Sequence, residues 1–127
     1  MLLGTHHIAI IATDYARSKD FYTRILGFKL LREHYREDRK TWRADLLLNN
    51  NTQIELFGFP DAPARPNYPE AAGLRHLALA TDNIDDTVAR LEKHKIPVEP
   101  IRTDPATQKR YTFFTDPDKL PLELYEI

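Results

Sequence analysis

The chain has 127 residues, of which 42% are hydrophobic and 29% are charged, a composition typical of one globular domain with a moderate core. Its formal net charge is −1, without long acidic or basic blocks, which argues against nucleic acid or an anionic membrane as a partner. It has no cysteine, which excludes disulfides, thiolate metal ligands and cysteine nucleophiles. No apolar run reaches the roughly 18 residues of a membrane span. The N-terminus also lacks a signal-peptide pattern, so we expect a soluble cytoplasmic protein.

The first half of the chain predicts the element order β-α-β-β-β. The expected elements are a strand at residues 6–12, a helix at 15–26, and strands at 28–35, 41–48 and 52–59. Thr13 or Asp14 is suited to cap the helix by accepting a hydrogen bond from a free backbone N–H. Gly27 stands where a helix ends in left-handed geometry.

A linker separates this half from the next. Residues 60–73 contain four prolines and end in a glycine, which predicts a stiff connection without regular structure. It is too short to separate two independent domains. We therefore expect a single domain over residues 1–127, with module one at about 4–59 and module two at about 74–127.

The second half repeats the same element order. Asp82 or Asn83 is the expected cap of a helix whose apolar residues Ile84, Val88 and Leu91 fall at helical spacing. Pro97 favours an edge position for the short strand predicted around it. The expected strands are residues 74–80, 96–98, 110–115 and 120–125.

Two chemically informative segments recur at nearly one offset. His7 opens an apolar run that ends in Thr-Asp, and His76 opens a similar run with the same ending. Glu55 lies within Ile-Glu-Leu-Phe, and Glu123 within Leu-Glu-Leu-Tyr. The two histidines are 69 positions apart and the two glutamates are 68 apart. This pattern indicates a duplicated supersecondary unit.

The duplication predicts a metal site. If the first and last strands of each module are neighbours, His7 approaches Glu55, and His76 approaches Glu123. Pairing the modules about a pseudo-two-fold axis would then bring all four side chains to one centre. Two imidazoles and two carboxylates suit Zn, Ni, Co, Mn or Fe(II), and these ligands alone do not choose among them. Coordination positions left to water would make the metal catalytic rather than structural.

Each of these residues also has an ordinary structural interpretation. A lone histidine on a strand is usually a core or surface residue, and a glutamate in an amphipathic strand usually faces solvent. The repetition of both residue types at one offset favours the metal. His6 is expected on the face opposite to His7, because side chains alternate along a strand.

Other residues offer weaker signals near the proposed centre. Phe57 and Tyr125 each follow a glutamate by two residues, so they either line a pocket or belong to the core. Lys109 and Arg110 either bind an anionic substrate or are ordinary exposed charges.

Four motifs together resemble the vicinal oxygen chelate superfamily over nearly the whole chain. They are His7-Ile-Ala-Ile before Thr-Asp, Phe21-Tyr with Ile25-Leu-Gly-Phe, His76-Leu-Ala-Leu, and Asp116-Pro-Asp before Leu122-Glu-Leu. The resemblance implies an α+β fold in which two tandem βαβββ modules pair into a half-open barrel of mixed sheet around a divalent metal. It also implies a homodimer as the usual assembly, with the modules pairing within one chain or across two.

Within that superfamily, the order His, Glu, His, Glu looks like glyoxalase I, also called lactoylglutathione lyase. The resemblance implies His7, Glu55, His76 and Glu123 as the metal ligands. It makes Ni, Zn or Co the first candidates for the metal, with Mn or Fe(II) as alternatives. It also implies Glu123 as the catalytic base, with Glu55 as the second candidate for that role.

The function that follows is a lyase or isomerase reaction on a small molecule, either a hemithioacetal or a related carbonyl compound. A carboxylate would move a proton between adjacent carbons through an enediolate that the metal stabilises. Two alternatives stay open: an Fe(II)-dependent dioxygenase of the same superfamily, and a non-catalytic resistance-type protein that binds a small molecule. The sequence leaves the metal, the thiol and the aldehyde unspecified.

Overall fold

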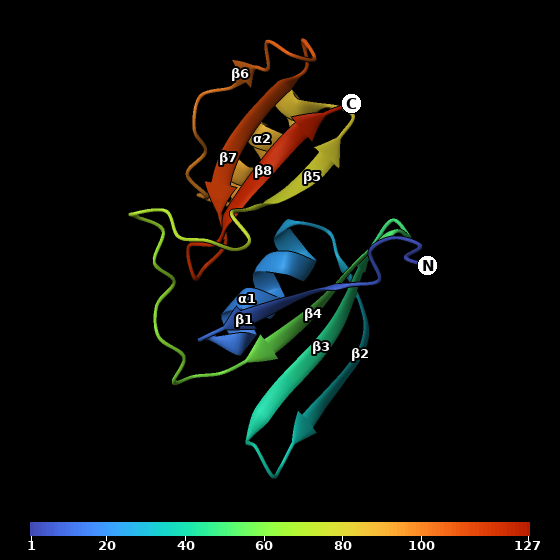
Figure 1. The fold of residues 1–127 in the computed structure, drawn as a ribbon, viewed down its shortest axis with the longest axis vertical. Coiled ribbons are helices and arrows are strands. Elements are labelled where there is room, and N and C mark those ends of the chain that lie inside the picture. Colours follow the sequence, from blue (N-terminus) through green and yellow to red (C-terminus); the bar gives the residue numbers. More distant parts are fainter. The chain divides into compact units, whose positions relative to one another are not determined.

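The computed structural model describes residues 1–127 and divides them into two compact units, Met1–Ala64 and Arg65–Ile127. We call these module one and module two. Each contains a four-stranded mixed sheet with helical structure against it, as Figure 1 shows for each module separately. The expected tandem βαβββ architecture is confirmed. None of the helices has the length and apolar character needed to cross a membrane.

Module one contains four strands and one helical segment in the expected order. They are β1 (Ile8–Ala12), α1 (Tyr15–Asp20), the π-helical turn η1 (Phe21–Ile25), β2 (Lys29–Arg36), β3 (Thr41–Leu48) and β4 (Thr52–Gly58). The order across the sheet is β1-β4-β3-β2. Strand β1 runs parallel to β4, and the other pairs are antiparallel. The first and last strands of the module are therefore neighbours.

The helical segment of module one begins and ends as expected but changes type within its length. Asp14 caps it, since the Arg17 N–H donates to the Asp14 side chain at 3.2 Å. After α1 the backbone takes the pattern of a π-helix, in which an N–H bonds the carbonyl five residues earlier instead of four. The Leu26 N–H, for example, donates to the Phe21 carbonyl at 3.0 Å. Gly27 follows with φ of +90°, a conformation that glycine adopts without a steric penalty.

Module two repeats the arrangement. Its elements are β5 (Leu77–Thr81), α2 (Ile84–Lys93), β6 (Arg102–Thr103), β7 (Arg110–Thr115) and β8 (Pro121–Glu126). The sheet order is β5-β8-β7-β6, with β5 parallel to β8. Asn83 is the residue that caps α2, and it accepts a hydrogen bond from the Asp86 N–H at 3.0 Å. Strand β5 begins three residues later than expected.

The strand predicted at residues 96–98 is wrong. That segment is irregular, and the edge of the sheet is formed by β6 instead. Pro97 and Pro100 have no N–H to donate, so a ladder cannot continue along this stretch. A backbone hydrogen bond to β7 remains just beyond this segment, from the Glu99 N–H to the Phe113 carbonyl at 3.0 Å.

Each module buries one face of its sheet under its own helix, with α1 against β4 and α2 against β8. Large buried side chains of module one include Tyr22, Leu46, Ile54 and Leu56, and those of module two include Ile84, Leu91 and Leu122. The apolar neighbours of Glu55 and Glu123 point into the core. Because successive side chains of a strand point to opposite faces, both carboxylates lie on the other face of their sheet. The core of each module thus determines the face on which the candidate ligands lie.

Candidate functional site

The first pair of candidate ligands meets within module one. The parallel register of β1 and β4 sets Ala9 opposite Glu55. His7 lies two residues before Ala9, and its Nε2 is 3.1 Å from Oε2 of Glu55. The histidine side chain is 36% exposed and the glutamate side chain 10%. We call this pair the first half-site; it presents one imidazole nitrogen and one carboxylate at a partly open surface.

The second pair meets in the same way within module two. The register of β5 and β8 sets Ala78 opposite Glu123, and His76 precedes Ala78 by two residues. Nε2 of His76 lies 3.9 Å from Oε2 of Glu123, with the two side chains 24% and 15% exposed. This distance is too long for a direct hydrogen bond. We call this pair the second half-site.

The residue preceding each histidine engages its Nδ1. Nδ1 of His6 lies 2.8 Å from Nδ1 of His7, and a guanidinium nitrogen of Arg75 lies 3.2 Å from Nδ1 of His76. Nε2 of each ring is therefore the nitrogen that faces the glutamate. The expectation that His6 lies on the face opposite to His7 is wrong. Both residues precede the first residue of β1, so the alternation of a strand does not apply to them.

Glu55 belongs to a series of linked ion pairs that the sequence pattern did not predict. Arg43 Nη2 lies 3.2 Å from Oε2 of Glu55, and Arg43 Nε lies 3.0 Å from Oδ1 of Asp45. Arg32 Nε lies 3.2 Å from Oδ2 of the same aspartate. The Asp45 side chain is only 2% exposed, so these pairs are shielded from solvent on the aspartate side. Arg43 thus bridges two carboxylates on neighbouring strands.

The surroundings of Glu123 are aromatic at the equivalent positions. Phe113 stands opposite Glu123 on β7, as Asp45 stands opposite Glu55 on β3. The Phe113 ring meets the His76 ring edge to face at 5.1 Å between centroids. Tyr111, two residues earlier, holds the position that corresponds to Arg43. The two half-sites therefore contain the same types of candidate ligand but differ in the residues that surround those ligands.

Module two offers cavities beside its half-site. One, of about 550 Å³, is bordered by His76, the segment before it and β7. A second, of about 390 Å³, is bordered by Glu123 and Tyr125. Arg75 and Arg102 line both, which gives them a mixed aromatic and cationic character. Volumes of this size accommodate a small organic molecule.

Tyr125 fits the expectation of a pocket wall. It borders the smaller cavity, and its hydroxyl donates to the Asp104 carboxylate at 2.9 Å while also bonding Thr107. The Thr107 bond lowers the pKa of Tyr125, but desolvation and the Asp104 carboxylate together raise it above its ordinary value. Tyr125 therefore stays a neutral hydrogen-bond donor at physiological pH. Phe57, its counterpart, stacks on Phe59 at 5.8 Å.

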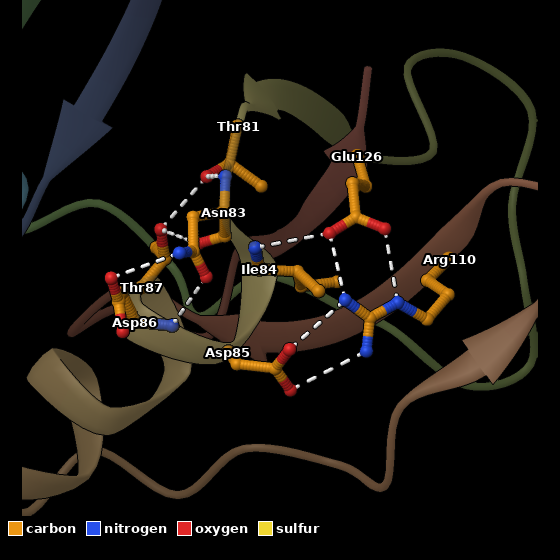
Figure 2. A network of polar contacts seen from close by, with 8 residues as sticks. All are labelled: Thr81, Asn83, Ile84, Asp85, Asp86, Thr87, Arg110 and Glu126. Carbon is orange, nitrogen blue, oxygen red and sulfur yellow. Dashed lines mark hydrogen bonds and ion pairs between the residues drawn. The ribbon is translucent and has the colours of Figure 1, made fainter.

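Arg110 belongs to a network of ion pairs and hydrogen bonds within module two (Figure 2). Its Nη2 lies 2.9 Å from both the Glu126 and the Asp85 carboxylates, which joins β7, β8 and the start of α2. The Ile84 N–H also donates to Glu126, at 3.4 Å. The Arg110 guanidinium holds the pKa of Glu126 below its ordinary value. The Arg110 side chain therefore links three elements of module two, a structural role that neither sequence-based interpretation had given it.

The sequence profile of the Glyoxalase/Bleomycin resistance protein/Dioxygenase superfamily matches residues 4–124 of this chain. The chain belongs to this superfamily. Members typically bind small-molecule substrates and a divalent metal ion, and they often form dimers. The His–Glu pairs described above lie at equivalent places in two repeats of the superfamily fold.

Relatives of known sequence and structure cover nearly the whole chain. The Escherichia coli protein YaeR is 64% identical, over 98% of this chain and 97% of its own length. The crystal structure of a glyoxalase family protein from Enterococcus faecalis superimposes with a TM-score of 0.90 at 46% identity, covering 97% of both chains. The trypanothione-dependent glyoxalase I of Leishmania major superimposes with a TM-score of 0.73 at 27% identity, covering 94% of this chain and 84% of that one.

The donor chemistry of both half-sites fits a divalent transition metal. Each offers an imidazole Nε2 and a carboxylate oxygen, which suit Zn, Ni, Co, Mn and Fe(II). Within each module, no third His, Asp or Glu side chain joins the pair to complete a centre. The structure thus brings the predicted ligands together two by two, and the four-ligand centre stays a prediction.

Proposed function

We propose that this protein is a divalent-metal-dependent lyase or isomerase of the glyoxalase I type, acting on a small hemithioacetal or a related carbonyl compound. His7, Glu55, His76 and Glu123 would hold the metal. The two half-sites would be joined either within one chain or across the two chains of a homodimer. Single-domain organisation over residues 1–127 is part of the same proposal.

The observation that carries the proposal is the equivalence of the two His–Glu pairs. In both modules the histidine lies two residues before an alanine, and that alanine faces the glutamate across a parallel strand pair. A structural histidine or a solvent-facing glutamate has no need of such a partner in either module. Similarity to a glyoxalase I of known structure gives further support to the reaction type.

When bound, the metal would act as a Lewis acid that polarises the neighbouring oxygens of the substrate. The remaining chemistry belongs to the chain. The Glu123 carboxylate accepts a proton from the carbon next to the substrate carbonyl, and the electron pair of the broken C–H bond moves toward that carbonyl. Glu123 then returns the proton to the adjacent carbon, and the hydroxyl proton of the hemithioacetal passes to the former carbonyl oxygen. The product is a hydroxyacyl thioester with the same atoms as the substrate.

The cavities of module two support this assignment of roles. Glu123 borders one cavity and His76 the other, so a small substrate bound there lies next to the proposed base. Phe113 borders both cavities, and Tyr125 borders the smaller one.

The test has two steps. Metal analysis of the purified protein comes first, followed by isomerisation assays on hemithioacetals made from methylglyoxal with several thiols. The proposal expects turnover of at least one of these substrates, abolished by a chelator and restored by Ni, Zn or Co. Activity that requires O2 would instead identify a dioxygenase. Ligand affinity that survives complete removal of metal would identify a binding protein.

A further inference from the structure

We propose that Arg43, anchored on the buried carboxylate of Asp45, is a positioning residue that fixes Glu55 for metal binding, and that Glu123 has no such brace. This inference rests on the proposed function, because it takes the two glutamates to be metal ligands. It assigns different roles to Glu55 and Glu123, which occupy equivalent positions in the two modules: Glu55 would be held in place, and Glu123 would be free to move.

The contact between Arg43 and Glu55 differs in kind from the contact between His7 and Glu55. Both are made to Oε2 of the glutamate, at 3.2 Å and 3.1 Å respectively. A histidine that binds a metal through Nε2 can no longer hold Glu55 through the same nitrogen. Arg43 has no part in coordination, since a guanidinium is cationic and offers no lone pair. Its hold on Glu55 therefore remains when His7 turns to the metal.

Arg43 is itself held by a buried carboxylate. Its Nε lies 3.0 Å from Oδ1 of Asp45, and Arg32 pairs with the other oxygen of the same carboxylate, Oδ2, at 3.2 Å. The ring of Phe57 lies 5.8 Å from the guanidinium and supports it by a cation–π contact. A charge-assisted hydrogen bond fixes the planar guanidinium of Arg43 on Asp45, and the ion pair of its Nη2 with Oε2 of Glu55 then holds the second carboxylate beside it. Glu55 thus reaches its ligand position already oriented.

Module two contains no equivalent brace. Tyr111 and Phe113 stand where Arg43 and Asp45 stand in module one, and neither supplies a guanidinium or a carboxylate. The hydrogen bond to Glu70 is the largest cause of the raised pKa of Arg75, and the charge of Glu123 adds a smaller contribution. The Arg75 guanidinium is paired with Glu70 instead, with its Nε 2.6 Å from Oε1.

The contrast separates the roles of the two glutamates. A carboxylate that must leave its ligand position to carry a proton benefits from the absence of a fixed partner. A carboxylate that only holds the metal benefits from a permanent one, since hydrogen bonds to a ligating carboxylate orient it. The brace on Glu55 therefore matches a permanent ligand, and the unbraced Glu123 matches the mobile one.

The test replaces the brace with the residues that the chain itself uses in module two. The double variant Arg43→Tyr/Asp45→Phe removes both charges and leaves no buried aspartate unpaired. Affinity for Zn²⁺ and Co²⁺ is measured by competition with a chromophoric chelator, and the Co²⁺ absorption spectrum reports the ligand geometry. Loss of an outer-shell partner typically costs about 10- to 100-fold in metal affinity, which is the weakening we expect.

Two single variants sharpen the comparison. Arg43→Lys keeps one positive charge but lacks the planar fork that sets the angle between two carboxylates, so its metal affinity should fall between those of wild type and the double variant. Arg36→Met removes an exposed arginine of β2 that pairs only with Asp38 and should leave metal affinity within about twofold of wild type. Circular dichroism establishes that each variant is folded before its metal affinity is compared.

The outcomes distinguish this inference from the function on which it rests. If the wild-type protein binds none of Zn²⁺, Ni²⁺ and Co²⁺ stoichiometrically, the proposed function fails and the positioning role fails with it. If the wild type binds metal and the folded Arg43 variants bind it equally well with an unchanged Co²⁺ spectrum, only the positioning role is overturned. Weaker binding in the order Lys variant, then double variant, supports it.

Discussion

Glu55 and Glu123 occupy the same register position in their respective modules, each opposite an alanine on a parallel strand and each within 4 Å of a histidine nitrogen. Their side chains are nearly buried, at 10% and 15% exposure. A carboxylate with so little access to water needs a compensating partner. The repetition of this arrangement is the observation on which the proposed metal centre rests.

Replacing Glu123 with glutamine should abolish turnover while the fold is retained. Glutamine has nearly the same shape but cannot accept the substrate proton, and general-base catalysis typically contributes about 10²- to 10⁴-fold in rate. We therefore expect kcat to fall by at least 10²-fold, measured with whichever hemithioacetal the wild type converts. Glu92→Gln, on the exposed side of α2, is the matched control and should behave like wild type. A Glu123→Gln enzyme that turns over at the wild-type rate would refute the assignment.

Removing the metal should lower thermal stability as well as activity. A ligand that binds only the folded state stabilises it by about 2.7 kcal/mol when present at 100 times its Kd. We expect Tm to rise when Zn²⁺ or Ni²⁺ is added back to chelator-treated protein. The double variant His7→Ala/His76→Ala should show no such rise, because it retains no imidazole at either half-site. An equal rise in wild type and double variant would mean that the metal stabilises the protein somewhere else.

The Arg110–Glu126 pair should make the stability of module two depend on pH. Arg110 lowers the pKa of Glu126 from its ordinary value of 4.5 in the folded state. The stabilisation is therefore fully present above pH 4.5 and is lost as the pH falls through the lowered pKa. Glu126→Gln should be less stable than wild type at pH 7, with a smaller loss between pH 5 and pH 3.

Urea denaturation at several pH values measures this effect. Glu37→Gln, in the exposed turn of module one, is the control and should follow the wild-type pH dependence. Identical pH profiles for wild type and Glu126→Gln would show that the ion pair contributes nothing to folding.

Truncation in the core of module two should destabilise the sheet that carries Glu123. Leu91 on α2 is only 1% exposed, and α2 lies against β8. Leu91→Ala should therefore cost roughly 2–5 kcal/mol in the free energy of unfolding. Leu74→Ala, at a side chain that is 64% exposed, should stay within about 0.5 kcal/mol of wild type. Equal effects of the two truncations in chemical denaturation would contradict the described core.

Much of the fold could be predicted because each strand carries its own local signals. Strands β3 and β7 begin and end at the predicted residues, where polar turns flank alternating or apolar runs. The prediction failed at residues 96–98, because Pro97 and Pro100 remove the donors that a strand requires. The change from α1 to η1 was also missed, since apolar spacing does not distinguish the two helix types.

The candidate ligands could be found from the sequence because duplication repeats them at a fixed offset. Arg43 and Asp45 could not be found in that way, since module two has Tyr111 and Phe113 in their places. Their importance arises from the register of β3 against β4, which sets Asp45 opposite Glu55. An alternating Arg-x-Asp on the polar face of β3 was the available signal, but it gains meaning only once the partner strand is known.

The most direct test of the shared metal centre is the metal content of His7→Ala and His76→Ala compared with that of wild type. If both half-sites serve one centre, wild type holds one divalent ion per chain, and each single variant loses most of it. If the half-sites were instead two independent metal sites, each single variant would lose only about half of the metal. That result, or a wild-type protein that takes up no stoichiometric Zn, Ni or Co, would contradict the account.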